Sequence, residues 1–252
     1  MIKVTKNTST QNIDLNEGLD LSMSLSNTEQ NPRAWYVKPP VFEPVRENGW
    51  IGSVQEGGAV NFRNIFFNPH GHGTHTECLG HITKEVYSIN KALKKFFFTA
   101  KVITIQPEER DINGSKDFII TKKLLEQQLP ENEKFEALII RTLPNTDEKL
   151  SKNYSSTNPP YLETACIERL NQCNIEHLLV DLPSVDREED GGELAFHHAF
   201  WNVPEAPQMH KTITELIFVP NHVPDGEYLL NLQVAPFEND AAPSRPVIYR
   251  YD

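Results

Sequence analysis

Four of the nine histidines in this chain fall within one twelve-residue segment, a density typical of a metal site. The segment reads His70-Gly-His-Gly-Thr-His-Thr-Glu-Cys-Leu-Gly-His81, with Glu77 two residues after His75. Imidazole nitrogens and carboxylate oxygens are ligands that zinc and manganese accept, and the glycines let the backbone turn so that several side chains can face one point. The segment therefore predicts half of a metal site. The alternative is a surface loop or a set of hydrogen-bonded core histidines.

The spacing of this segment differs from that of two common motifs. Gly71 and Gly73 disfavour the helix of a His-Glu-x-x-His site, and no Gly-Lys-Ser/Thr follows as in a phosphate-binding loop. The preceding apolar and aromatic run, residues 60–67, has the length of a strand and ends at Asn68-Pro69. We therefore expect the histidines just past the end of a strand.

Further metal ligands are expected elsewhere in the chain, because this segment alone would leave a metal under-ligated. His197 and His198 form one candidate pair, and either could face the site. Glu215 is another candidate, since its charge interrupts the apolar run at 212–219. Its carboxylate lies either on the solvent face of an alternating strand or buried against positive charge.

Strand-like and helix-like segments alternate along the rest of the chain. Strands are predicted at 96–106, 135–142, 177–182, 213–219, 228–235 and 246–251, and helices at 122–128, after a cap at Thr121, and at 161–173. The predicted fold class is α/β, with an extensive, mixed, strand-rich sheet covered by helices. No segment has the composition of a linker, so a single domain over residues 1–252 is expected.

Composition limits the partners of the protein. The net charge of −11 and the pI near 5.3 argue against nucleic acid, because a phosphate backbone needs clustered Lys and Arg. No segment approaches the ~20 apolar residues of a membrane span, and the first residues lack the apolar stretch of a signal peptide. We expect a cytoplasmic protein that acts on a small molecule, without nucleic-acid or membrane partners.

The three cysteines form no CxxC pair, which fits a reducing compartment. Cys166 and Cys173 fall at helical spacing with leucines and are expected in the core. Cys78 lies inside the histidine segment and could be a soft ligand or a nucleophile. Neighbouring residues of an extended chain point to opposite faces, so Cys78 is expected to point away if Glu77 faces the metal.

These features together resemble the metal-dependent cyclase family, whose best-understood activity is kynurenine formamidase (arylformamidase). The core pattern of that family is His-x-Gly-Thr-His-x-Asp-x-Pro-x-His, and Gly73-Thr-His75, Glu77 and His81 stand at the corresponding spacing. The resemblance extends over about residues 13 to 248 and implies the swivelling β/β/α fold of the family. Further matching segments are Ile13-Asp-Leu15, Ile140-Arg-Thr142, Pro183-Ser-Val-Asp186 and Ala242-Pro-Ser-Arg245.

The chain departs from the family pattern within the motif itself. Gly71 stands where the family has its first histidine, with His70 and His72 on either side. We expect His70 to take that place, with His72 as the alternative. Glu77 replaces an aspartate and Leu79 a proline, which leaves the metal preference and the substrate open.

The resemblance implies a ligand set and a mechanism. One or two divalent ions per chain, most simply Zn²⁺ with Mn²⁺ as the alternative, would activate a water and polarise a carbonyl. His81 would serve as general base and acid, the alternative being a further ligand or an outer partner. The implied reaction is hydrolysis of a C–N bond in an amide or formamide. The implied ligands are His70, His75, Glu77, one of His197 and His198, and Glu215.

Other functions fit the same residues. They are hydrolysis of a lactone or a cyclic imide, metal binding without turnover, and metal-dependent oxidoreduction, since His/Glu sites also hold iron. Family members are typically homo-oligomers with sites close to a subunit boundary, so the resemblance implies a homodimer or homotetramer. Trp35, Tyr36, Trp50 and the Phe66-Phe67 pair could wall a substrate pocket or lie in the core or an interface.

Overall fold

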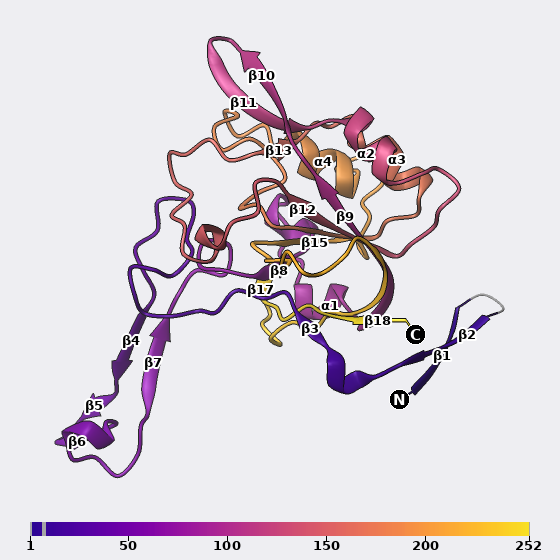
Figure 1. Cartoon of the computed structure of the whole chain (residues 1–252). Helices are drawn as coiled ribbons and strands as arrows, with labels where there is room; N and C mark the ends of the chain where they lie inside the picture. The colour runs from indigo at the N-terminus through magenta and orange to yellow at the C-terminus, as the bar shows by residue number, and fades with distance from the viewer. Residues whose placement is uncertain (1, 7–8, 252) are drawn as a thin grey trace.

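A nine-stranded mixed sheet runs through the centre of the computed structural model, which describes residues 2–6 and 9–251 (Figure 1). Its middle is parallel and consists of β9 (Phe97–Ile105), β12 (Ala137–Thr142), β14 (His177–Val180) and β15 (Thr212–Glu215). Antiparallel strands continue it on both sides. Beyond β15 lie β8 (His75–Glu77) and β17 (Ala241–Pro243), and beyond β9 lie β16 (Gly226–Asn231), β18 (Val247–Arg250) and β3 (Leu19–Asp20).

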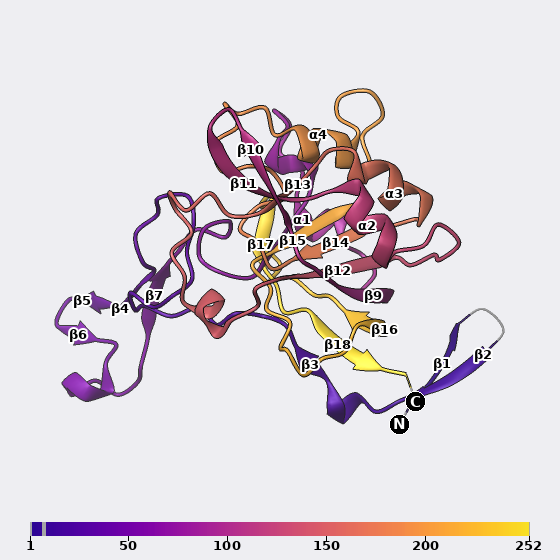
Figure 2. The ribbon, with the colours of Figure 1, turned by 45° about the horizontal axis from the view of Figure 1, so that its top comes forward.

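Both faces of the sheet are buried, which confirms the predicted strand-rich α/β class. One face carries the helices α2 (Lys122–Gln128), α3 (Cys166–Gln172) and α4 (Ala195–Trp201), as Figure 2 shows. Leu138 and Ile140 of β12 pack on that side, whereas Ala137 and Ile139 belong to a second apolar cluster that includes Ile89 of α1 (Ile89–Ala92). No helix among the described residues is long and apolar enough to cross a membrane.

Several predicted elements are confirmed with shorter bounds. Thr121 caps α2 by accepting a hydrogen bond from the Leu124 amide, and Cys166 and Cys173 are buried in the core. The helix predicted at 161–173 begins only at residue 166. The first two residues of that range form the short strand β13 (Tyr161–Leu162), which lies beside the hairpin of β10 (Glu108–Ile112) and β11 (Ser115–Ile120).

Ile13-Asp-Leu15, which resembles the opening strand of the cyclase family, does not enter the central sheet. Ile13 ends β2 (Ser9–Ile13), which among the described residues pairs with β1 (Ile2–Lys6) alone, in a separate hairpin. Asp14 then caps a 3-10 turn at residues 15–17 by accepting the Asn16 amide. Local capping therefore ends the extended chain before it reaches the sheet.

A second hairpin projects from the body of the molecule, and we call its residues 41–66 the arm (Figures 1 and 2). In it β4 (Val41–Pro44) pairs with β7 (Arg63–Phe66), and β5 (Arg46–Glu47) and β6 (Trp50–Ile51) form the tip. The strand predicted at 60–67 is thus an arm strand. The histidine segment follows its end, as expected, but the same segment also supplies β8, a strand of the central sheet that the sequence reasoning missed.

Candidate metal centre

Two neighbouring strands bring three prospective ligands together. His75 and Glu77 alternate with Thr76 along β8 and therefore share one face of the sheet. On the adjacent antiparallel strand β15, Glu215 lies opposite His75, and their Oε2 and Nε2 atoms are 3.4 Å apart. All three side chains are buried. Of the two positions considered for Glu215, the solvent face of a strand and the interior, the structure shows the interior.

Helix α4 adds His197, and the loop before it fixes the direction of its ring. Asp186 accepts hydrogen bonds from the amides of Phe196 and His197 and, at 2.5 Å, from Nδ1 of the His197 ring. Nε2 consequently faces Glu77 Oε1 at 3.0 Å. Burial lowers the pKa of His197, but the hydrogen bonds to Asp186 and Glu77 outweigh it and raise the pKa to about 10.

His70 reaches the other oxygen of Glu77. Its Nδ1 lies 3.0 Å from Glu77 Oε2, and its Nε2 lies 2.7 Å from Asp240 Oδ2. Against the effect of burial, these two carboxylates raise the pKa of His70 to about 10. A Cβ at Gly71 would lie 2.9 Å from the Val37 side chain, so the position of the family's first histidine has little room for a side chain here.

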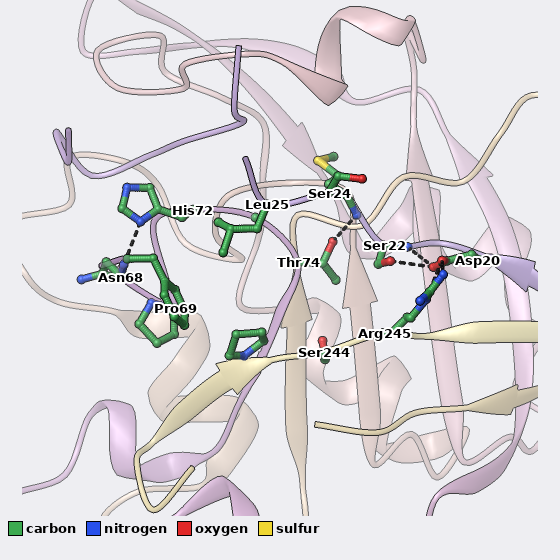
Figure 3. A pocket seen from close by; sticks show the side chains of 14 residues that line it. Asp20, Ser22, Ser24, Leu25, Asn68, Pro69, His72, Thr74, Ser244 and Arg245 are labelled. Atoms are coloured by element: carbon green, nitrogen blue, oxygen red, sulfur yellow. Dashed lines mark hydrogen bonds and ion pairs between the residues drawn. The ribbon is translucent and has the colours of Figure 1, made fainter. Parts of the chain in front are cut away.

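The two alternative histidines do not lie in this cluster. His72 points to the other side of its loop, where its Nδ1 accepts the Asn68 amide at 2.7 Å (Figure 3) and its Nε2 donates to the Lys38 carbonyl at 2.6 Å. His198 donates to the Val203 carbonyl at 3.4 Å, because successive helix residues are turned by about 100° from one another. Of His70 and His72, only His70 lies at the centre, and of His197 and His198, only His197 does.

His81 stands at the mouth of the cluster. It ends the 3-10 turn Leu79–His81, and its side chain is 31% exposed. Its Nε2 is 3.9 Å from Glu77 Oε2, its Nδ1 is 3.4 Å from Asp240 Oδ2, and its ring stacks on that of His70 with centroids 4.2 Å apart. It thus has one nitrogen toward the buried carboxylate and is open to solvent.

Asp240 is a site residue that the sequence reasoning missed. It immediately precedes β17, whose first residue Ala241 pairs with Glu77 of β8, so the topology brings it to the motif. Its position just before the matching segment Ala242-Pro-Ser-Arg245 was the available signal.

Cys78 has no place in the cluster. Its Sγ lies 3.5 Å from the Tyr87 carbonyl in the second apolar cluster, on the face opposite to Glu77, as the alternation predicted. Burial raises the pKa of this thiol to about 11. It is therefore a protonated core side chain at neutral pH.

The residues present fit a divalent cation, and His75 gives the strongest sign of it. Its Nδ1 donates to the Gly73 carbonyl at 2.9 Å, so in the neutral ring Nε2 carries a lone pair. Within the part of the chain that the structure describes, that buried nitrogen has no hydrogen-bond partner, and it faces the carboxylate of Glu215, which is also an acceptor. A cation between the two acceptors would satisfy both. Donor atoms of His75, Glu77 and Glu215 all lie within 4.8 Å of one another, as do those of His70, Glu77 and His81.

A cavity of about 350 Å³ leads to this centre. His70, His81, His197 and Glu215 line it on the side of the centre. Apolar contributions come from Trp35, Val37 and Leu194, and charged ones from Arg187, Glu188 and Asp190.

Only one of the aromatic residues considered for a pocket lines this cavity. Trp35 does so, in a left-handed conformation with φ of 59° that it shares with Tyr36. Tyr36 is 63% exposed, and Trp50 and Phe66 are exposed on the arm. The bulk of the aromatic set therefore lies outside the pocket.

Comparison with known proteins identifies the family. Residues 19–187, more than half of the chain, match the family model described as "Putative cyclase". The protein therefore belongs to this cyclase family. A search of curated proteins gives no match.

Solved structures share the fold at low sequence identity. The chain is 15% identical to a protein of Bacillus stearothermophilus described as a predicted metal-dependent hydrolase, with a TM-score of 0.63 over 92% of this chain and 98% of that one. It is 14% identical to isatin hydrolase A of Labrenzia aggregata, with a TM-score of 0.67 and 94% of each chain covered. Isatin hydrolase A of Ralstonia solanacearum gives 16% identity and a TM-score of 0.61, over 92% of this chain and 91% of that one.

Proposed function

We propose that this protein is a metal-dependent hydrolase that cleaves the C–N bond of a small amide or formamide. The observation that carries the proposal is the buried Nε2 of His75, which has no hydrogen-bond partner among the described residues and faces the Glu215 carboxylate at 3.4 Å. Glu215 in turn lines the cavity. Two acceptors held together in this way are costly unless a cation joins them.

Four buried side chains would hold the cation: His75, Glu77, His197 and Glu215. Nδ1 of His70 lies beside the second oxygen of Glu77, and these two atoms could hold a second cation that shares the Glu77 carboxylate with the first. Mixed imidazole and carboxylate ligands suit Zn²⁺ and also Mn²⁺, and we propose Zn²⁺ first. A bound divalent cation supplies Lewis-acid activation of a water and of a substrate carbonyl.

His81 is the proposed general base and acid. Its Nε2 faces the centre, and its ring lines the cavity. From there it can take the proton of the attacking water and return it to the nitrogen that leaves when the C–N bond breaks. Its partial exposure lets the ring exchange protons with solvent between turnovers.

The cavity supports a small substrate with an apolar part. Trp35, Val37 and Leu194 provide an apolar wall opposite the histidines, and the volume of about 350 Å³ suits a molecule of about one or two rings. Arg187 is held by Asp117 through its Nε at 2.7 Å and so is already neutralised. An uncharged amide therefore suits the site better than an anionic one.

A cyclic amide is a specific second candidate. Three of the solved neighbours are isatin hydrolases, and isatin carries its C–N bond within a ring. Ring opening uses the same attack at a carbonyl and the same proton return. Lactones and cyclic imides belong in the same screen.

The test is a hydrolysis screen with zinc-loaded and chelator-treated protein. The panel contains an N-formyl arylamine, an anilide, isatin, a cyclic imide and an aryl lactone. Turnover of an amide that disappears with chelator and returns with zinc would support the proposal. Turnover of the lactone alone would contradict C–N cleavage, and no zinc-dependent turnover of any compound would contradict hydrolysis.

We also propose that a second copy of the chain covers the arm, in a homodimer or homotetramer. The arm exposes Trp50, Phe62, Ile65 and Phe66, each more than 40% accessible, and a two-stranded hairpin cannot bury such side chains alone. Sedimentation equilibrium should show an oligomer that Phe62→Ser with Phe66→Ser weakens at least tenfold. Val86→Ser, at a residue 85% exposed outside the arm, is the matched control. A monomeric wild type would contradict this assembly.

A further inference from the structure

One oxygen of Asp240 faces two imidazoles. His70 and His81 stack with an angle of 29° between their rings, and each has one nitrogen toward Asp240 Oδ2 and the other toward Glu77 Oε2. The nitrogen facing Asp240 is Nε2 in His70, at 2.7 Å, but Nδ1 in His81, at 3.4 Å. The two rings thus lie in opposite senses between the same two carboxylates.

The structure is built to bring Asp240 this close. Its carbonyl accepts the Cys78 amide at 3.1 Å, which ties the start of β17 to the motif. A side chain at Gly80 would approach the Asp240 Cβ to 3.2 Å and the Tyr87 carbonyl to 2.3 Å, so the glycine leaves the space that both occupy. Among the described residues, the ion pairs of Asp240 are with His70 and His81 only.

We propose that Asp240 is a positioning residue that gives these two histidines different roles. The inference rests on the proposed function, because it concerns how the imidazoles meet a cation. A carboxylate can only accept hydrogen bonds, and each ring has Asp240 on one side and Glu77 on the other. When a cation occupies the Glu77 side, each neutral ring keeps its proton on the nitrogen that faces Asp240. His70 is thereby left with a lone pair on Nδ1 for the cation, and His81 with a lone pair on Nε2 for proton transfer.

This arrangement has a direct chemical consequence. A carboxylate behind a metal-binding imidazole fixes the tautomer and the ring orientation, and its removal typically costs about 10- to 100-fold in metal affinity. In Asp240→Asn the amide oxygen can still take the place of Oδ2, which both rings face, but the negative charge is lost. The hydrogen bonds that hold the two rings are therefore weakened together.

The experiment compares zinc affinity and imidazole N–H signals in three proteins. Wild type, Asp240→Asn and Glu238→Gln are titrated with Zn²⁺ against a chromophoric chelator, and their zinc-loaded forms are compared by ¹H–¹⁵N correlation of the histidine rings. Glu238→Gln is the matched control. It removes the same charge two residues away, from an exposed carboxylate that pairs with Lys91 at 3.0 Å and Asn90 at 2.7 Å.

The expected result is a proton on Nε2 of His70 and on Nδ1 of His81 in wild type and in Glu238→Gln. In Asp240→Asn both N–H signals should move upfield, because their hydrogen bonds weaken, and Zn²⁺ should bind about 10- to 100-fold more weakly. Asp240→Glu, which restores an acceptor-only group, should return both signals toward their wild-type positions, and this separates a positioning effect from a general disturbance of the fold.

Two outcomes would overturn the inference in different ways. Wild-type affinity and unchanged N–H signals in Asp240→Asn would show that Asp240 does not position the rings, while the proposed function would stand. A wild type that binds no Zn²⁺ would overturn the proposed function and this inference with it.

Discussion

The centre has a buried base and an open mouth, and the two regions are built for different tasks. At the base, the side chains of His75, His197 and Glu215 are at most 4% exposed and are fixed by backbone groups or by Asp186. At the mouth, the side chains of His70 and His81 are 19% and 31% exposed and stack on each other. Groups that hold a cation need rigidity, whereas a group that exchanges protons with substrate, as proposed for His81, needs access. The same residue type therefore serves both tasks through its surroundings.

The largest effect should come from removing a ligand at the base. His75→Ala deletes the buried nitrogen that faces Glu215 and should weaken zinc binding by more than about 100-fold, beyond the range of outer-sphere changes, and abolish zinc-dependent turnover. Calorimetric titration with Zn²⁺ measures the affinity. His198→Ala, whose ring lies on the same helix as His197 but outside the cluster, should change it less than about threefold. Equal losses of zinc affinity in the two variants would show that His75 is not a metal ligand.

A change at the mouth should separate turnover from metal binding. His81→Ala removes the proposed general base of catalysis but none of the four buried ligands. We therefore expect kcat to fall about 10²- to 10⁴-fold while the zinc content stays that of the wild type. The measurement is steady-state kinetics on the substrate found in the screen, with elemental analysis of the same samples. Loss of the metal together with activity would show that His81 is a metal ligand and not only a general base.

Glu215→Gln tests the base more gently. The amide oxygen can still accept the Val185 amide, which lies 3.2 Å from Oε1, so the local structure should persist. Loss of the negative charge should weaken zinc binding about 10- to 100-fold, a range taken from changes around metal sites. Glu205→Gln in the exposed loop before β15 is the control in the same titration. Unchanged affinity would remove Glu215 from the ligand set.

The pH dependence of metal binding connects the two regions. His70 at the mouth and His197 at the base both have a pKa raised to about 10, so in the metal-free protein both are protonated at neutral pH. A cation must displace the proton on the nitrogen facing Glu77 in each ring. The apparent affinity should therefore rise with pH between about 6.5 and 10, up to about tenfold per unit for each proton displaced.

Calorimetry in two buffers of different ionisation enthalpy counts these protons. Release of two protons would be consistent with both imidazoles in the metal site, and release of one would leave one of them outside it. An affinity independent of pH would contradict both roles.

Local pattern gave the first half of the centre, and tertiary structure decided the second. The density of His and Glu at 70–81 was sufficient to predict a metal site and to select His75 and Glu77. The choice between His197 and His198 depended on which ring faces Asp186, and that direction is set by the start of α4. The burial of Glu215 followed from its antiparallel neighbour β8, which the sequence reasoning had not assigned as a strand.

Asp240 was out of reach for a related reason. It lies 163 positions after Glu77 in the sequence, and only the pairing of the edge strand β17 with β8 brings it to the motif. The apolar runs predicted the central strands well because both faces of the sheet are buried. The arm strand at 63–66 has a similar apolar pattern but is exposed, so an apolar run alone does not tell a strand of the central sheet from a strand of the arm.

The proposed metal site is best tested by the metal-to-chain ratio of the wild-type protein, purified without chelator and then equilibrated with zinc or manganese. We expect one or two equivalents of a divalent metal per chain, retained through gel filtration and removed by chelator. A ratio near zero under these conditions would show that the buried histidines and carboxylates do not form a metal site.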